Sequence, residues 1–108
     1  MARILLVDDD PEQLDIRKRI IEGAGHEVRT AVTKSEALGK FLGCKVVIMD
    51  LHLPEVSDGV DLIRGIGGAA RVIVLSGDDA PAGVQADAFL LKPCPSRRLL
   101  EAVAKLCG

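Results

Sequence analysis

The sequence predicts an α/β fold in which helices cover both faces of a five-stranded parallel sheet. Short apolar runs recur along the chain, and polar or turn-forming residues follow each of them at once. Runs of this kind are typical of parallel strands that are buried on both faces. Four of the runs end in a polar group: residues 4–7 lead to Asp8, residues 46–49 to Asp50, residues 72–75 to Ser76 and residues 88–91 to Lys92.

The first strand is expected at residues 3–7, and the first helix at residues 11–22. Asp10 suits the N-cap of that helix and Pro11 suits its first position. Three residues recur at helical spacing on the face that should meet the sheet: Leu14, Arg17 and Ile21. Glycines at positions 23 and 25 then end the helix.

The next segment predicts a strand at the edge of the sheet. Residues 26–31 alternate between polar and apolar side chains, which is typical of a half-exposed strand. Thr33 and Glu36 have the spacing of a capping box, so a second helix is expected over residues 34–42. The third strand then runs into Asp50.

The second half of the chain continues the alternation of strands and helices. A loop over residues 51–58 precedes a third helix at residues 59–66, and the fourth strand ends at Ser76. Residues 77–83 contain Pro and Gly, so at most two helical turns are expected before the fifth strand. The last helix is expected from Ser96. Its apolar stripe consists of Leu99, Val103 and Leu106.

The composition bounds both the size of the domain and its partners. The chain has 108 residues and is 48% hydrophobic, which is enough for one compact domain over residues 1–108. The formal net charge is −2 and the aromatic residues are two Phe, so a basic face and stacking platforms are both missing. Direct binding to nucleic acid is therefore not expected.

The sequence also bears on location. No apolar run approaches the roughly 18 residues of a transmembrane helix, and the first residues lead into a strand rather than a signal peptide. We therefore expect a cytoplasmic protein with no membrane partner. The three cysteines are widely spaced and form no C-x-x-C, so neither a disulfide framework nor a zinc site is expected.

The polar groups at the strand ends suit phosphoryl chemistry. The carboxyl ends of parallel strands meet at one edge, where ligands bind in open α/β sheets. Asp8, Asp9 and Asp50 would repel one another there, and a divalent cation such as Mg²⁺ would relieve that repulsion. A carboxylate can also accept a phosphoryl group as a nucleophile. Lys92 would then supply positive charge, and Ser76 a hydrogen bond.

Taken singly, these residues have simpler explanations. Asp10 is expected to be an N-cap, Ser76 a turn or cap residue, and Lys92 a solvated charge. His26 is expected at the surface, whereas His52 could line the mouth of the site. The functional hypothesis therefore depends on the coincidence of polar groups at four strand ends.

Four segments together resemble a response-regulator receiver domain of two-component signalling: residues 6–10 (Leu-Val-Asp-Asp-Asp), 49–54 (Met-Asp-Leu-His-Leu-Pro), 75–77 (Leu-Ser-Gly) and 91–93 (Leu-Lys-Pro). The resemblance covers essentially the whole chain. It implies a flavodoxin-like three-layer fold with strand order 2-1-3-4-5. It also implies that Asp50 accepts a phosphoryl group from a histidine kinase or a histidine phosphotransfer protein. Such a domain is a phosphoacceptor that assists its own phosphorylation and dephosphorylation, rather than an enzyme.

The resemblance further implies a metal site at the same edge. Mg²⁺, or Mn²⁺ in its place, would be bound by residues matching Asp9 and Asp50 and by the main-chain carbonyl of His52. Asp8 would contribute through water. No organic cofactor is implied.

The resemblance also implies how the phosphoryl group is bound and sensed. The hydroxyl of Ser76 and the amine of Lys92 would bind phosphoryl oxygens, and the peptide bond before Pro93 would be cis. Phe89 falls at the position of the family's switch aromatic. Its ring would turn inward when the hydroxyl of Ser76 is drawn toward the phosphate.

Two departures from the family pattern affect the expected surfaces. The chain between Pro54 and Gly59 is one residue longer than the pattern, which reshapes the loop over the site. The chain between Ser76 and Lys92 is several residues shorter, so the fourth helix is expected to be shortened or missing. Many receivers dimerise or signal through the face made by that helix, the fifth strand and the last helix. This chain is therefore expected not to use the usual dimer mode, and its output partner is of unidentified class.

Two other classes of function are alternatives. A haloacid-dehalogenase-like phosphatase would use Asp8 as its nucleophile, and Asp10, Ser76 and Lys92 follow in the matching order. No acidic pair follows Lys92, however, and 108 residues leave little room for a substrate cap. The third hypothesis is a non-phosphorylated protein-binding module whose acidic site only holds a metal.

Overall fold

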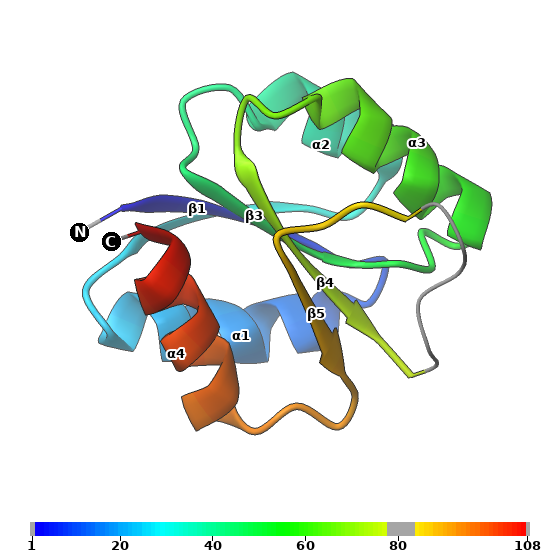
Figure 1. The fold of residues 1–108 in the computed structure, drawn as a ribbon. Helices are drawn as coiled ribbons and strands as arrows, with labels where there is room; N and C mark the ends of the chain where they lie inside the picture. Colours follow the sequence, from blue (N-terminus) through cyan, green and yellow to red (C-terminus); the bar gives the residue numbers. More distant parts are fainter. Residues whose placement is uncertain (1, 78–83, 108) are drawn as a thin grey trace.

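The computed structural model describes residues 2–77 and 84–107, and strands alternate with helices along them (Figure 1). The first half contains β1 (Arg3–Val7), α1 (Pro11–Gly23), β2 (Glu27–Ala31), α2 (Lys34–Lys40) and β3 (Val46–Asp50). The second half contains α3 (Val56–Ile66), β4 (Arg71–Ser76), β5 (Ala88–Leu91) and α4 (Ser96–Cys107). No helix in these two ranges is long and apolar enough to span a membrane.

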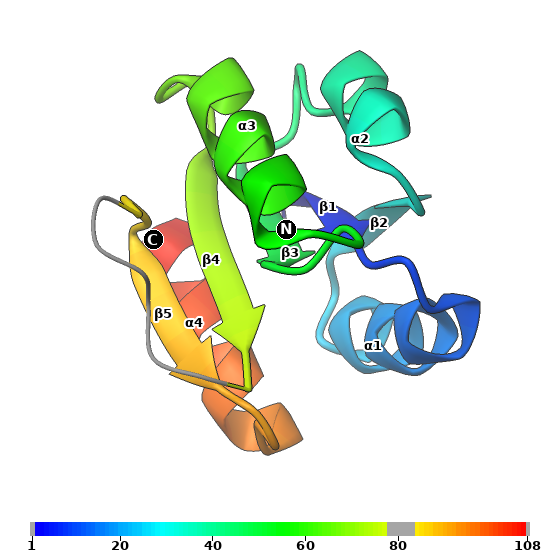
Figure 2. The same cartoon turned by 90° about the vertical axis from the view of Figure 1, so that its right-hand side faces the viewer.

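The strands form one sheet in three layers with the helices. All neighbouring strands are parallel, and their order is β2-β1-β3-β4-β5, which confirms the predicted order. Helices α1 and α4 cover one face of the sheet, and α2 and α3 cover the other (Figures 1 and 2). The chain reverses its direction of winding between β1 and β3. In open sheets of this kind a crevice forms there, outside the carboxyl ends of the strands.

The sheet separates two hydrophobic cores, because successive residues of a strand face opposite sides. In β1, Leu5 and Val7 join the core under α2 and α3, whereas Ile4 and Leu6 join the core over α1 and α4. All five residues of β3 are buried. Full burial of a Leu or Ile side chain is worth about 1.5–3 kcal/mol. The buried strands β1 and β3 therefore fix the position of the carboxyl edge of the sheet.

Strand β2 lies at one edge of the sheet, as predicted. Its residues are exposed or half-buried except for Ala31, the last residue of the strand, which is buried in the core. The alternating pattern thus predicted both the edge position and the partial exposure of this strand.

Helix α2 is capped at one point and ends earlier than predicted. Thr33 Oγ1 accepts a hydrogen bond from the N–H of Glu36 at 3.1 Å, which is half of the predicted capping box. The Glu36 carboxylate pairs with Lys40 at 3.0 Å. The helix ends at Lys40 rather than residue 42, because the chain turns toward β3 through Gly43, whose φ is 83°.

Helix α3 begins at Val56, earlier than the predicted residue 59. The carbonyl of Glu55 accepts hydrogen bonds from the N–H groups of Asp58 and Gly59, at 3.1 and 3.4 Å, and so starts the helix. Gly59 therefore lies inside the helix rather than at its start. A Cβ at Gly59 would collide with the carbonyl oxygen of Leu51, so the glycine permits a close approach of two backbones.

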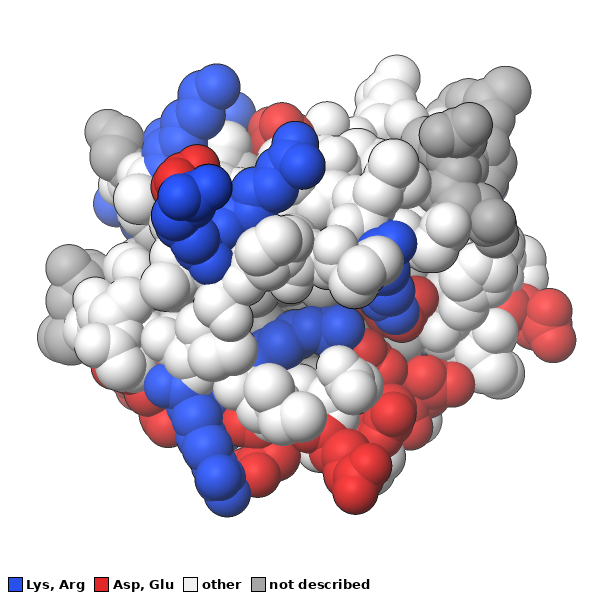
Figure 3. Space-filling view, turned by 90° about the horizontal axis from the view of Figure 1, so that it is seen from below, with Lys and Arg blue, Asp and Glu red and all other residues white. Residues whose placement is uncertain are grey.

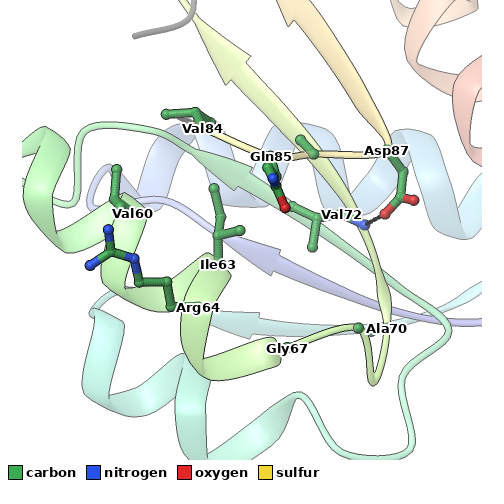
Figure 4. Close-up of a pocket in the computed structure, with 11 residues that line it drawn as sticks. Val60, Ile63, Arg64, Gly67, Ala70, Val72, Val84, Gln85 and Asp87 are labelled. Carbon is green, nitrogen blue, oxygen red and sulfur yellow. Dashed lines mark hydrogen bonds between the residues drawn. The ribbon is translucent and has the colours of Figure 1, made fainter. Parts of the chain in front are cut away.

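The connection from β4 to β5 contains no helix in its described residues, which are 77 and 84–87. Residues 78–83, on which the prediction of a shortened or missing helix between β4 and β5 falls, lie outside the described residues. The chain enters β5 through Asp87, whose carboxylate accepts from the N–H of Val72 at 2.7 Å (Figure 4). The residues around this contact border a pocket of about 540 Å³, lined among others by Val60, Ile63, Arg64, Val72, Val84 and Asp87.

Candidate functional site

Polar side chains from four strands meet at the carboxyl edge of the sheet. Asp8 follows β1, Asp50 ends β3, Ser76 ends β4 and Lys92 follows β5. The register places these ends side by side: Val7 pairs with Met49, Asp50 with Leu75, and Ser76 with Leu91. Asp8, Asp50 and Ser76 are only 2%, 7% and 1% exposed. A buried carboxylate is costly unless it is paired, so the partners of these groups define the site.

Asp50 is held by a main-chain donor and by a basic side chain. Its Oδ1 accepts a hydrogen bond from the N–H of His52 at 3.0 Å. Its Oδ2 forms an ion pair with Nζ of Lys92. The main-chain N–H of Lys92 also donates to the carbonyl of Ser76 at 2.8 Å, which ties the end of β5 to the end of β4. A cation thus lies against the carboxylate where negative charge would build up during phosphoryl transfer.

Asp8 is balanced by a residue of α1. Its Oδ2 accepts from Nη1 of Arg17 at 2.6 Å, and its Oδ1 accepts from the N–H of Asp10 at 2.9 Å. The Arg17 side chain is 14% exposed, so this ion pair is largely shielded from water. Asp10 itself accepts from the N–H of Glu12 at 3.0 Å, which confirms its predicted role as the N-cap of α1.

Asp9 lies on the exposed side of the same cluster. Partial desolvation raises the pKa of its carboxyl group above the ordinary value, and so do a hydrogen bond to Asp8 and the negative charges of Asp8 and Asp50. A main-chain hydrogen bond opposes the shift. The three carboxylates therefore lie close enough to repel one another, which is the condition under which a divalent cation stabilises them.

The donor chemistry of this edge fits Mg²⁺, but its side chains are engaged elsewhere. Carboxylate oxygens are the ligands that Mg²⁺ prefers. Within residues 2–77 and 84–107, no three His, Cys, Asp or Glu side chains are arranged to hold a metal ion as they stand. Two of the three carboxylates are ion-paired with basic side chains, Asp8 with Arg17 and Asp50 with Lys92. Metal binding at this edge requires the carboxylates to turn from these partners or to share them.

The loops after β3 and β5 each contain a cis proline. The Lys92–Pro93 peptide bond is cis, as the family resemblance implied, and Leu53–Pro54 is cis as well. His52, just before the second of these bonds, is exposed at the edge, and its main-chain N–H points to the carboxylate of β3. The metal-binding role of its carbonyl oxygen stays a prediction.

The predicted switch residues lie on neighbouring strands. Ser76 is buried at the end of β4. Phe89 lies in β5, opposite Val74, and its partly buried ring packs against the core under α2 and α3. The two residues therefore lie on adjacent strands, with Phe89 level with the residue two positions before Ser76, and their role as a switch stays a prediction.

Arg17 is the residue of this site for which the sequence predicted no function. It was expected on the inward stripe of α1 together with Leu14 and Ile21, and both of those residues are buried. A guanidinium group at an inward position needs a carboxylate partner. A charged residue on an otherwise apolar face of the helix that follows three aspartates was therefore the signal that could have identified Arg17 as a site residue.

Figure 3 shows the face of the molecule that carries α1 and α4. Acidic side chains gather at one end of this face, and basic side chains are spread over the rest.

A cavity of about 520 Å³ lies between α1 and the start of α4, lined among others by Gln13, Ile16, Arg17, Lys92, Pro93 and Leu99. The two basic side chains that hold the site's carboxylates thus border one cavity.

The comparisons with known proteins identify the family to which this fold belongs. Residues 4–104 match the response regulator receiver domain family, and the chain belongs to that family. It is a receiver domain of two-component response regulators. The comparisons give no support to a haloacid-dehalogenase-like phosphatase or to a non-phosphorylated binding module.

Relatives and solved structures agree with this assignment. The transcriptional regulatory protein PrrA of Mycobacterium leprae is 34% identical over 115 residues, which cover 96% of this chain and 49% of PrrA. The chain thus spans about half the length of the curated relatives that it matches first. A CheY-like receiver domain protein from Methanospirillum hungatei superimposes with a TM-score of 0.86 at 32% identity, covering 99% of this chain and 94% of that one.

A second solved structure bears on the site. The response regulator TrrA of Thermotoga maritima, solved in complex with Mg²⁺-BeF, superimposes with a TM-score of 0.86 at 30% identity. The superposition covers 98% of this chain and 99% of TrrA. The two chains thus share the fold over almost their whole lengths.

Proposed function

We propose that this receiver domain accepts a phosphoryl group on Asp50 and changes conformation in response. The observation that carries the proposal is the buried carboxylate of Asp50 at the end of β3, bound by the ammonium group of Lys92 and the N–H of His52. Asp8 is held by a helix residue instead, and Asp9 is exposed. Asp8 also has a cation and a main-chain donor, but Asp50 is the carboxylate whose cation, Lys92, follows a neighbouring part of the sheet edge and whose strand pairs with the strand that ends in Ser76.

The transfer depends mainly on positioning and on charge. A carboxylate oxygen of Asp50 attacks the phosphorus of a phosphohistidine and forms a new O–P bond. The P–N bond breaks, and the imidazole nitrogen keeps its electron pair and takes up a proton. Lys92 then binds one phosphoryl oxygen and the hydroxyl of Ser76 donates to another. The donor is a histidine kinase or a histidine phosphotransfer protein.

A divalent cation is part of the proposal. Asp9, Asp50 and the main-chain carbonyl of His52 would bind Mg²⁺, or Mn²⁺ in its place, with Asp8 contributing through water. When bound, the cation would supply positive charge to the phosphoryl oxygens. Desolvation raises the pKa of Asp9, and the nearby negative charges of Asp8 and Asp50 raise it further. These neighbouring charges support the assignment, as does the Mg²⁺-BeF complex of the structurally similar TrrA.

The response is proposed to pass through Ser76 and Phe89. Movement of the Ser76 hydroxyl toward a phosphoryl group on Asp50 would open space beside β4, and the ring of Phe89 would turn inward to fill it. The burial of Ser76 and the partial burial of Phe89 on the adjacent strand support this mechanism.

The proposed context is a phosphorelay in which residues 1–108 act as a single receiver domain. The domain assists its own phosphorylation and dephosphorylation, and we propose no separate enzymatic activity for it. The relatives are regulatory proteins, among them the sensory/regulatory protein RpfC of Xanthomonas campestris. The output partner would bind a surface that changes when Asp50 is phosphorylated.

The test is intact-protein mass spectrometry after incubation with Mg²⁺ and acetyl phosphate. Wild type should gain one phosphoryl group, whereas Asp50→Asn should gain none. Asp8→Asn should be labelled more slowly than wild type because it weakens the metal site. A label that survives Asp50→Asn and disappears in Asp8→Asn would contradict the proposal.

A further inference from the structure

The ion pair between Arg17 and Asp8 joins α1 to the acidic site. Arg17 lies between Leu14 and Ile21 on the inward face of the helix, and both of these neighbours are buried. A position of this kind normally carries an apolar side chain. The guanidinium group can lie there because it reaches a carboxylate, with Nη1 lying 2.6 Å from Oδ2 of Asp8.

The pair satisfies Asp8 within the protein. One carboxylate oxygen binds Arg17, and the other accepts from the main-chain N–H of Asp10 at 2.9 Å. The carboxylate is 3% exposed and the arginine side chain 14% exposed, so water screens the pair weakly. Asp8 is thereby both neutralised and fixed in orientation without any bound ion.

The negative charges of the site can be balanced by basic side chains of the protein or by a bound divalent cation. Three carboxylates face the site, from Asp8 and Asp9 after β1 and from Asp50 at the end of β3. Two cations face them, Arg17 from α1 and Lys92 from the loop before α4, and both of these side chains border the cavity between the two helices. A divalent cation at the carboxylates would add to positive charge that is already present.

We propose that Arg17 is a positioning residue that acts as a built-in counter-ion for Asp8 and thereby sets how tightly the site binds Mg²⁺. The inference rests on the proposed function, in which Mg²⁺ binds at this edge. Arg17 stabilises the acidic cluster without metal. A water on Mg²⁺ must then share the carboxylate of Asp8 with the guanidinium group, and the ion must bind near the positive charge of that group. The ion therefore binds more weakly than it would to the carboxylates alone.

The test is isothermal titration calorimetry with MgCl₂ on the whole domain at fixed ionic strength. Arg17→Met removes the charge and keeps a long side chain, and it should bind Mg²⁺ about tenfold more tightly than wild type, a change of about 1.4 kcal/mol. Arg17→Lys keeps the charge and should bind Mg²⁺ about as wild type does. Arg17→Gln keeps an N–H donor without the charge, and it replaces the Met variant if that variant does not fold.

Thermal unfolding provides a second readout that does not depend on phosphorylation. In EDTA, Arg17→Met should unfold at a lower temperature than wild type, because Asp8 loses its buried partner. Saturating Mg²⁺ should raise its unfolding temperature by more than it raises that of wild type. A residue with only a packing role would shift the unfolding temperature equally with and without Mg²⁺.

Arg19→Met is the matched control. Arg19 lies on the same helix, is 77% exposed and pairs with Asp15 at 2.9 Å. The same substitution there removes the same charge away from the site, so its Mg²⁺ affinity should stay within about twofold of wild type.

The outcomes separate the inference from the function on which it rests. If wild type binds Mg²⁺ and Arg17→Met binds it equally or more weakly, the inference is wrong and the metal site stands. If neither wild type nor any variant binds Mg²⁺, the proposed metal site is wrong and the inference falls with it. Tighter binding in Arg17→Met, with wild-type affinity in Arg17→Lys, supports the inference.

Discussion

At the scale of single residues, two ion pairs organise the acidic edge of the sheet. Lys92 holds Asp50, and Arg17 holds Asp8. A hydrogen bond to a charged group contributes about 1.5–3 kcal/mol. The two basic residues therefore decide the orientation of the buried carboxylates before any ligand binds. They differ in position, because Lys92 follows β5 at the sheet edge whereas Arg17 reaches the site from a helix.

The position of Lys92 leads to a prediction about the rate of phosphorylation. Lys92→Ala should slow labelling by acetyl phosphate about 10²-fold, because a cation is lost from the place where charge builds up on the phosphoryl oxygens. Lys92→Arg should retain part of the rate, since it keeps the charge with a different geometry. The rates are measured by intact mass at timed intervals. Equal rates in wild type and Lys92→Ala would contradict the assigned role.

At the scale of secondary-structure elements, close contacts of the backbone set how the loops meet the helices. The start of α3 passes so near the loop after β3 that only a residue without a Cβ fits at Gly59. The start of β5 is fixed in another way, by hydrogen bonds of Asp87 to both main-chain groups of Val72. The contact at Gly59 thus holds the loop after β3, which carries His52, whereas the contact at Asp87 ties the beginning of β5 to β4.

The contact at Gly59 is tested by comparing two glycines in helices. Gly59→Ala should lower the free energy of unfolding by about 1–3 kcal/mol, because its Cβ meets the backbone of Leu51. Gly39→Ala, in α2, has open space around the new Cβ and should raise it by about 0.5–1 kcal/mol. Urea unfolding followed by far-UV circular dichroism measures both. If both variants change the free energy of unfolding in the same direction, the prediction is wrong.

The contact at Asp87 is tested by hydrogen exchange. The carboxylate of Asp87 accepts from the N–H of Val72 at 2.7 Å and from Nη1 of Arg71 at 3.2 Å. Asp87→Ala should lower the free energy of unfolding by about 1–3 kcal/mol, because it leaves the amide of Val72 without that acceptor. The amide of Val72 should exchange faster in this variant, as measured by NMR. Unchanged exchange at Val72 would show that the contact does not stabilise β4.

At the scale of the whole molecule, the two cores on either side of the sheet make the domain one unit. Both include residues of β1, β3 and β4, so neither core can be lost without the other. Urea unfolding should therefore be a single transition, with coincident curves from circular dichroism and from methyl NMR signals. Two separated transitions would contradict the proposal of one domain over residues 1–108.

Much of this architecture could be predicted from the sequence, for physical reasons. The strands were predictable because doubly buried parallel strands are continuous apolar runs. The grouping of Asp8, Asp50, Ser76 and Lys92 followed, because the carboxyl ends of parallel strands share one edge. The strand order came from the family resemblance rather than from the pattern of residues.

The parts that could not be predicted depend on the path of the chain in space. The start of α3 was placed too late because Gly59 serves a contact with Leu51, and this contact is set by how the preceding loop folds. The ion pair of Arg17 was not predicted because its partner follows β1 and the helix must first dock on the sheet. The helix and strand propensities of single residues contain no information about either contact.

The central claim is that Asp50 is the residue that carries the phosphoryl group. The most direct measurement treats the domain with Mg²⁺ and acetyl phosphate, reduces the acyl phosphate with borohydride, and maps the modified peptide by tandem mass spectrometry. Borohydride converts an aspartyl phosphate to homoserine, so the modified position can be read from the fragments. We predict homoserine at position 50 alone. Homoserine at position 8 or 9, or an unmodified Asp50 in protein that has gained a phosphoryl group, would contradict the claim.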